Sequence, residues 1–260
     1  MRQTFDLFSD IFARRDNVLR RMDPRAKLVI AVATILAVIL SARVELPLAI
    51  FAACLGAMLA VRMPPRLIVV RLAAPMGIVL VLVVLQSLMI GTTPLLTFPL
   101  GAWQLTVMRE GLLRGLLIGS RVLGAVSVVL LLSSVTPAYE IFRALRWFRV
   151  PNGWVEIAML MYRYVFTLLD QTADVVAAQK VRLGYSTFRR SVASMGVLAG
   201  TVIVRSIDQA TNTHEAMIAR GYRNTMPFGP MPGMRAKDPW VLCLALLAVL
   251  SAYLMLGWRP

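Results

Sequence analysis

The residues that most often carry catalysis or bind metals are scarce in this sequence of 260 residues. It has one histidine, His214, and two cysteines, Cys54 and Cys243, each inside an apolar stretch. A zinc site needs several Cys or His ligands, and a redox pair needs two closely spaced cysteines. None of the three lysines ends the glycine-rich run of a nucleotide-binding P-loop. We therefore predict no catalytic residue, no metal site and no bound cofactor.

Charged residues are also few, and most of them carry the same sign. They make up 16% of the chain, hydrophobic residues make up 58%, and the mean hydropathy is +0.72. A soluble domain of this size would lack the polar side chains to cover its surface. Yet 28 basic residues face 13 acidic ones, for a net charge of +15. This combination predicts an all-α integral membrane protein whose basic residues orient it in the lipid bilayer, rather than a protein that binds nucleic acid.

About five apolar stretches are predicted to cross the membrane. The first two are slightly shorter than a usual span, but the basic residues beside them can extend to the interface. An uncharged loop that contains Gly91 and Gly101 separates the third span from the fourth. The spans are residues 28–42, 46–61, 72–90, 109–135 and 240–257. The chain then divides into an N-terminal segment (1–27), four transmembrane helices (28–135), a polar region (136–239) and a last span with the C-terminus (240–260).

The distribution of Lys and Arg predicts the orientation. Residues 137–239 contain 13 Lys and Arg and 7 Asp and Glu, and the N-terminal segment and the 62–71 loop are basic too. Because basic loops stay inside, we expect a multi-pass protein of the inner or plasma membrane with a cytoplasmic N-terminus and a cytoplasmic 136–239 region. The N-terminus does not have the pattern of a signal peptide.

Two arginines, Arg114 and Arg121, lie seven residues apart inside the fourth predicted span. A charge at membrane depth is a candidate for function. The alternative is that this helix face points into the bundle, with Glu110 pairing with Arg114 one turn away. The sequence does not decide between these roles.

The cytoplasmic region is predicted to contain one short and two long helices. Thr136–Pro137 is typical of a helix start, and long helical runs follow over 154–182 and 190–220. Each long run is too charged to span a bilayer and too apolar for open water. We therefore expect both helices at the cytoplasmic border of the membrane, and whether 154–169 or 191–204 enters the bilayer stays open.

The two long runs resemble each other at an offset of 38 residues. Asp170–Gln171 recurs as Asp208–Gln209, and Arg182 recurs as Arg220. One interpretation is that Arg and Gly merely end two helices, as the helix dipole and C-cap preferences favour. The other is that two matched basic ends bind a partner present in two copies. The endings read Val181–Arg182–Leu183–Gly184–Tyr185 and Ala219–Arg220–Gly221–Tyr222.

Four segments in this order resemble the transmembrane T component of energy-coupling factor (ECF) transporters. Leu19 to Leu28 reads L-R-R-M-D-P-R-A-K-L, close to the family's L-D-P-R-x-K-L, and Thr136–Pro137 would open its first cytoplasmic helix. The two arginine-bearing endings, Ala178 to Gly184 and Glu215 to Tyr222, resemble the family's arginine motifs. The family's arginine motif is usually Ala-Arg-Gly. The first ending departs from it, because Val181 and Leu183 flank its arginine.

The resemblance implies a coupling subunit. The T component joins two ABC-type ATPases to a substrate-binding membrane protein, the S component, and ATP hydrolysis takes place in the ATPases rather than in this chain. Arg182 and Arg220 would dock into the ATPases, with Val181, Leu183, Gly184, Ala219 and Gly221 beside them. Residues 160–166 look most like the subgroup for cobalt or nickel, the other substrates of the family being vitamins. Whether the two ATPases are identical, and how many copies assemble, is left open.

Two other functions fit an apolar, basic membrane protein. A membrane-embedded transferase needs clustered carboxylates to hold Mg²⁺ and a diphosphate, whereas the acids here are scattered, with Asp170 and Asp174 the closest pair in the cytoplasmic region. A conventional ABC permease would form its own substrate path and would need no S component.

Overall fold

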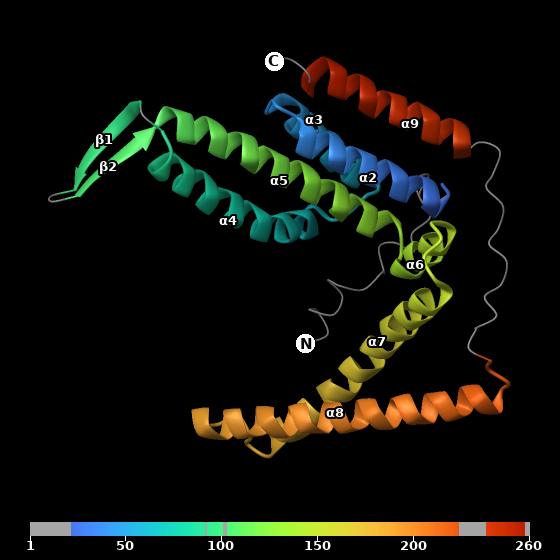
Figure 1. Ribbon diagram of the computed structural model, residues 1–260. Helices are drawn as coiled ribbons and strands as arrows, with labels where there is room; N and C mark the ends of the chain where they lie inside the picture. Colours follow the sequence, from blue (N-terminus) through green and yellow to red (C-terminus); the bar gives the residue numbers. More distant parts are fainter. Residues whose placement is uncertain (1–21, 92, 101–102, 224–237, 258–260) are drawn as a thin grey trace. The chain divides into compact units, whose positions relative to one another are not determined.

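The computed structural model describes residues 22–91, 93–100, 103–223 and 238–257. Most of the predicted N-terminal segment, residues 1–21, therefore lies outside the described residues. Helices dominate the fold (Figure 1), which confirms the predicted all-α membrane class. The helices are α2 (Pro24–Leu40), α3 (Glu45–Ala60), α4 (Pro65–Met89), α5 (Arg109–Val135), α6 (Ala138–Trp147), α7 (Asn152–Val181), α8 (Phe188–Ala219) and α9 (Asp238–Ala252), which continues into a π-helical turn (Tyr253–Gly257).

Four helical segments are long and apolar enough to cross a membrane. They are α4, α5, α8 and residues Pro239–Leu256. Helices α2 and α3 coincide with the first two predicted spans, and with 17 and 16 residues they are shorter than these four segments. Helix α8 was expected at the membrane border, yet an 18-residue part of it is apolar enough to span and is not buried by the rest of the chain. The apolar exterior of α8 thus requires either lipid or a partner.

The third predicted span begins earlier than expected. Residues 62–71 were predicted to be a loop, but α4 starts at Pro65, so Arg66 and Arg71 belong to its first turns. A proline at the first helical position has its φ angle already set for a helix, and its missing N–H costs nothing there. Pro64–Pro65 is therefore a helix start rather than the end of the preceding one.

The predicted loop between the third and fourth spans contains a β-hairpin. Strand β1 (Pro94–Leu100) pairs antiparallel with β2 (Trp103–Met108), and Leu100 lies opposite Trp103 next to the turn. These are the only strands in the described part of the chain, and they do not change its helical class. β-Favouring residues on both sides of Gly101, such as Phe98, Thr106 and Val107, are the signal for this hairpin in the sequence.

Close packing against α5 organises the transmembrane helices. Three glycines spaced four residues apart, Gly111, Gly115 and Gly119, face α4, and a side chain at any of them would collide with it. A Cβ at Gly119 would lie 2.7 Å from the Val79 Cγ1 atom, and one at Gly111 would meet α4 backbone carbonyls. Small residues at this spacing let membrane helices approach closely. The motif was not among the predicted ones, although the spacing of four residues between the glycines is visible in the sequence.

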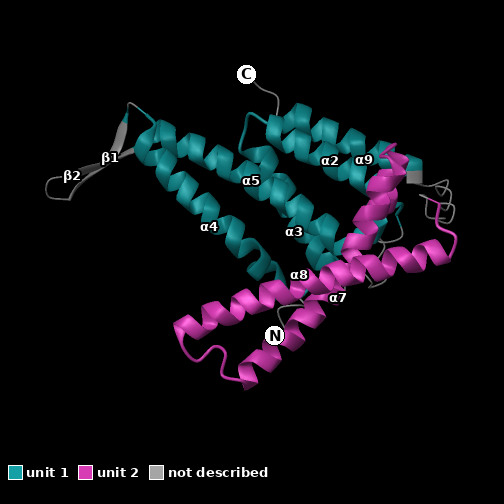
Figure 2. Cartoon of the chain, turned by 60° about the horizontal axis from the view of Figure 1, so that its bottom comes forward, with its two compact units in different colours: residues 1–141, 233–260 teal, residues 142–232 magenta. Residues whose placement is uncertain are grey.

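The chain divides into two compact units, residues 1–141 with 233–260, and residues 142–232 (Figure 2). The second unit consists mainly of α7 and α8, joined by a short corner. Both helices expose apolar stripes with helical spacing, whereas the hydrogen bonds between them involve polar side chains. The exposed stripes include Trp154, Ile157, Met161 and Val165 on α7, and Phe188, Val192, Met195, Ile203 and Ile207 on α8.

Candidate functional site

Arg182 is the C-cap residue of α7, and the turn after it is a Schellman motif. The Gly184 N–H donates to the Gln179 carbonyl at 2.8 Å, and the Leu183 N–H donates to the Lys180 carbonyl at 3.0 Å. This motif requires a left-handed residue directly after the C-cap. Leu183 takes that conformation with φ +59°, although left-handed backbone is unfavourable for a residue with a side chain.

Arg220 is the C-cap residue of α8 and has the same geometry. The Tyr222 N–H donates to the Met217 carbonyl at 3.0 Å, and the Gly221 N–H donates to the Ile218 carbonyl at 2.9 Å. Here glycine takes the left-handed position, with φ +82°. The two endings therefore superimpose residue for residue at the offset of 38. Leu183 therefore corresponds to Gly221, and Gly184 corresponds to Tyr222, although aligning the glycines of the two endings would put one extra residue in the first.

Both arginine side chains are exposed and available to a partner. Within the described residues, neither Arg182 nor Arg220 makes a side-chain hydrogen bond or an ion pair. Apolar side chains stand beside them, with Val181 85% and Leu183 65% exposed and Ile218 also exposed. A guanidinium surrounded by apolar surface suits a pocket that has an acidic centre and an apolar rim. Each of the two helix ends presents an exposed guanidinium next to exposed apolar side chains.

A local network of polar groups fixes the corner after Arg182. The Gln179 side-chain amide donates to the Ser194 carbonyl at 2.9 Å, and the Ser194 hydroxyl donates to the Gly184 carbonyl at 2.9 Å. The Tyr185 hydroxyl donates to the Gln179 side-chain oxygen at 2.7 Å. A Cβ at Gly184 would lie 2.6 Å from the Ser194 Oγ atom. Gly184 is thus required by close packing, not by its backbone angles.

The segment after Arg220 is fixed by a residue far away in the sequence. The Tyr222 hydroxyl donates to Glu156 Oε2 at 3.1 Å, and the Glu156 side chain belongs to a buried residue near the start of α7. Loss of hydration and the adjacent Glu156 carboxylate raise the pKa of the Tyr222 phenol. The phenol therefore remains protonated, and able to donate, at neutral pH. Sequence analysis did not single out Glu156 or Tyr222 as a pair, because 66 residues separate them.

The two arginines within α5 differ in their surroundings. Arg121 donates from Nε and from a terminal nitrogen to the Ser41 carbonyl, at 3.1 and 2.6 Å. Ser41 is the C-cap residue of α2, where a positive charge is favourable. Arg114 is exposed. Arg121 therefore has a structural role in ending α2.

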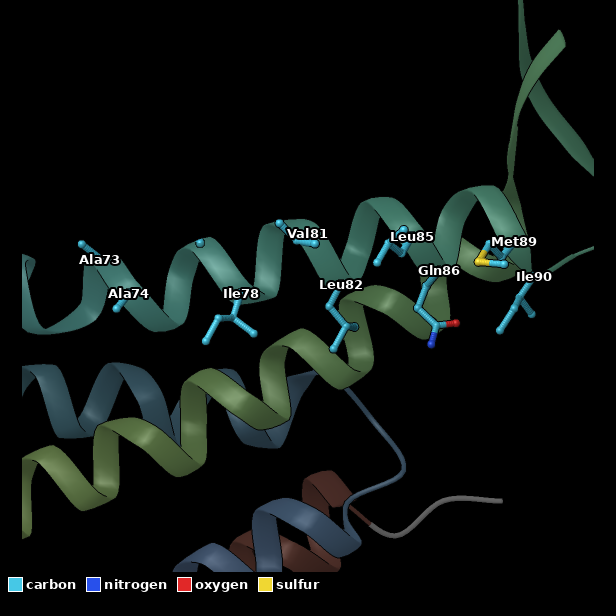
Figure 3. Close-up of a pocket in the computed structure, with 10 residues that line it drawn as sticks. Ala73, Ala74, Ile78, Val81, Leu82, Leu85, Gln86, Met89 and Ile90 are labelled. Carbon is cyan, nitrogen blue, oxygen red and sulfur yellow. The ribbon is translucent and has the colours of Figure 1, made fainter. Parts of the chain in front are cut away.

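Other surfaces offer less specific chemistry. A groove of about 640 Å³ follows α4 from Ala73 to Ile90 and is lined almost entirely by apolar side chains (Figure 3). Gln86 is its one amide. Among the residues that the structure describes, no three His, Cys, Asp or Glu side chains gather closely enough to hold a metal ion.

The fold and these two helix ends define a class, the polytopic helical membrane proteins that present paired arginines on long helices. Residues 15–228 match the CbiQ family, described as "Cobalt transport protein". Because this match covers most of the chain, the protein belongs to that family of membrane transport components.

Individual relatives agree with the family match. An uncharacterized protein of Methanocaldococcus jannaschii is 28% identical over 207 residues, which cover 79% of this chain and 77% of that protein. The cobalt transport protein CbiQ of Rhodobacter capsulatus is 34% identical over 128 residues, or 48% of this chain and 52% of that protein. The protein of the same name from Salmonella typhimurium is 27% identical over 156 residues, or 58% and 69%.

Proposed function

We propose that this chain is the membrane-embedded coupling subunit of an ECF-type importer for cobalt ions. Two cytoplasmic ABC ATPases bind the arginine ends of α7 and α8, and a separate S component captures the ion. The chain itself is not an enzyme, since ATP is hydrolysed in the ATPases. Membership in the cobalt transport family supports cobalt over nickel or a vitamin as the substrate.

The observation that carries this proposal is the identical geometry of the two arginine ends. Arg182 and Arg220 are both C-cap residues of Schellman motifs, and both are exposed. A partner that binds one end has the same backbone and the same guanidinium available at the other. A pair of related ATPases is a partner of this kind.

The apolar stripes of α7 and α8 support an S component as the third subunit. These faces are too apolar for open water, and Met161 and Met195 give them side chains that adapt to a moving partner. In the proposed orientation, the N-terminus and residues 136–239 lie in the cytoplasm of a cell whose inner or plasma membrane holds the chain. That orientation places both arginines on the side where ATP is available.

Co-purification of the full chain with its ATPases tests this function. We expect the wild-type chain to capture two ATPase subunits and the membrane-bound S component, and the reconstituted complex to accumulate radioactive cobalt only with ATP. Arg220→Glu should abolish capture at one docking site. Capture of ATPases together with uptake that needs no S component would indicate a conventional permease, and failure to capture any ATPase would contradict the proposal.

Reporter fusions test the orientation separately. A reporter that is active only in the cytoplasm should be active when it is joined to the N-terminus or inserted after residue 223. Activity of an exported reporter at those positions would contradict the proposed topology.

A further inference from the structure

A buried carboxylate stands near the start of α7, in a helix turn that is otherwise apolar. Glu156 is 4% exposed, next to Val155, which is 2% exposed. Burying a carboxylate is costly unless hydrogen-bond donors compensate for the lost water. The Tyr222 phenol, at 3.1 Å from Oε2, is one such donor. The contact joins the fifth residue of α7 to the segment that follows the end of α8.

Tyr222 serves the Arg220 end in two ways at once. Its backbone N–H closes the Schellman motif on the Met217 carbonyl, and its side chain reaches Glu156. Only Gly221 separates it from Arg220. The position of Arg220 is therefore set by the short segment 220–222. Its last residue, Tyr222, is hydrogen-bonded to Glu156 of α7.

A second contact supports the same alignment of the two helices. The Tyr164 and Thr213 hydroxyls are hydrogen-bonded at 2.9 Å, and the Gln209 side-chain amide donates to the Thr213 hydroxyl oxygen at 3.2 Å. Tyr164 lies two turns after Glu156 on α7, and Thr213 lies two turns before Arg220 on α8. Hydrogen bonds between polar side chains thus join the last third of α8, and the segment after it, to the first half of α7.

We propose that Glu156 and Tyr222 are a positioning pair that couples the Arg220 end of α8 to the start of α7. The inference rests on the proposed function, in which Arg220 docks into an ATPase. A displacement of Arg220 is transmitted through Tyr222 to Glu156, near the start of α7. Residues 148–151 connect α7 to α6, which follows α5 in the chain. Arg182 needs no such pair, because it directly follows α7 and is joined to Glu156 through that helix itself.

Reconstituted transport with matched variants tests the pair. The complex of the full chain, ATPases and S component is placed in liposomes, and cobalt uptake and ATP hydrolysis are measured together. Tyr222→Phe should lower cobalt taken up per ATP about tenfold, the effect expected for losing a hydrogen bond to a charged group. Glu156→Gln keeps an acceptor oxygen and should stay within about threefold of wild type. Tyr185→Phe, which removes a bond within the corner, is the control and should change the ratio less than twofold.

A distance measurement tests the geometry without relying on transport. Ile157 and Ile218 are exposed residues on the two helices that the pair joins. Spin labels at Ile157→Cys and Ile218→Cys, with Cys54 and Cys243 replaced by alanine, should give one narrow distance distribution in the full chain. Tyr222→Phe should broaden it, and Tyr185→Phe should not.

The outcomes separate this inference from the proposed function. An unchanged uptake-to-ATP ratio or an unchanged distance distribution in Tyr222→Phe would overturn the positioning pair, even if ATPases still bind. A loss of uptake fully explained by lost ATPase capture would also overturn it, because it would indicate a merely structural role. A wild-type chain that captures no ATPase would overturn the proposed function, and the pair's role in coupling with it.

Discussion

The ends of α7 and α8 share one backbone geometry but are held in place differently. At the end of α7, Gln179, Gly184 and Ser194 form a compact corner whose bonds join residues at most 15 positions apart. At the end of α8, the contact spans 66 residues, because Tyr222 reaches back to Glu156. A repeated sequence has thus produced two helix ends of equivalent backbone geometry that are attached to the rest of the chain differently. The difference predicts that the two arginines contribute equally to binding, and that only coupling through Arg220 depends on the contact between Tyr222 and Glu156.

Removal of either arginine is the largest expected effect. Arg220→Ala and Arg182→Ala should each weaken ATPase binding by roughly 2–5 kcal/mol, because each leaves an acidic partner group unpaired. Binding of purified ATPases to the full chain in nanodiscs measures this. Lys at either position should restore part of the affinity, since it keeps the charge but loses the planar fork. A large loss at one position and none at the other would show that the two ends are not equivalent docking sites.

A methyl group at Gly184 tests the compact corner. Gly184→Ala places a Cβ 2.6 Å from Ser194 Oγ and 2.9 Å from the Gln179 carbonyl oxygen. Overpacking of this kind costs about 1–3 kcal/mol, and the apparent melting temperature of the full chain in detergent should fall. Gly196→Ala is the matched control, since a Cβ at Gly196 meets nothing within 4 Å. Equal effects of the two substitutions would argue against a packed corner.

An exchange of the residues at the left-handed positions tests the shared backbone geometry. Leu183→Gly should stabilise the chain by at most about 1 kcal/mol, because removing the left-handed penalty at φ +59°, about 1–2 kcal/mol, outweighs the entropic cost of glycine, about 0.5–1 kcal/mol. Gly221→Leu should destabilise it by about 1–2 kcal/mol at φ +82°. Thermal unfolding of the two variants should therefore shift in opposite directions. Shifts of the same sign would mean that the two ends differ in backbone conformation.

Loss of one hydroxyl from the corner is the smallest expected effect. Ser194→Ala removes the hydrogen bond to the Gly184 carbonyl and should cost about 0.5–1 kcal/mol. It also removes the atom nearest to a Cβ at Gly184, so the double variant with Gly184→Ala should be more stable than the sum of the two single effects predicts. Strict additivity in the same unfolding assay would contradict the contact between these residues.

Helix boundaries were largely predictable from local signals. Helix α5 was predicted over 109–135 and has those bounds, and α7 and α8 begin and end within two residues of the predicted runs. Proline and glycine explain this accuracy, because their effects on the backbone depend on neighbouring residues only. The same signals were misread once, at Pro64–Pro65, where a helix start was taken for a loop.

Contacts between distant residues were not predictable from one sequence. The pairing of Glu156 with Tyr222, and of Arg121 with the Ser41 carbonyl, depends on how helices pack. The left-handed Leu183 also escaped the sequence analysis, because the following glycine suggested that the turn comes one residue later. The candidate arginines were found from the repeat, but the attachment that distinguishes them needed three-dimensional structure.

The length of α8 sets the spacing between the two proposed docking points. Arg182 lies in the corner at its beginning and Arg220 directly follows its end, so its 32 residues separate them by roughly 48 Å at 1.5 Å per residue. The length of the helix therefore determines both the distance between the two arginines and the direction in which Arg220 points. Adding one residue would lengthen it by only about 1.5 Å but would turn Arg220 by about 100°. Natural variation in the length of this helix should accordingly come in whole turns, matched to the distance between the grooves of the bound partners.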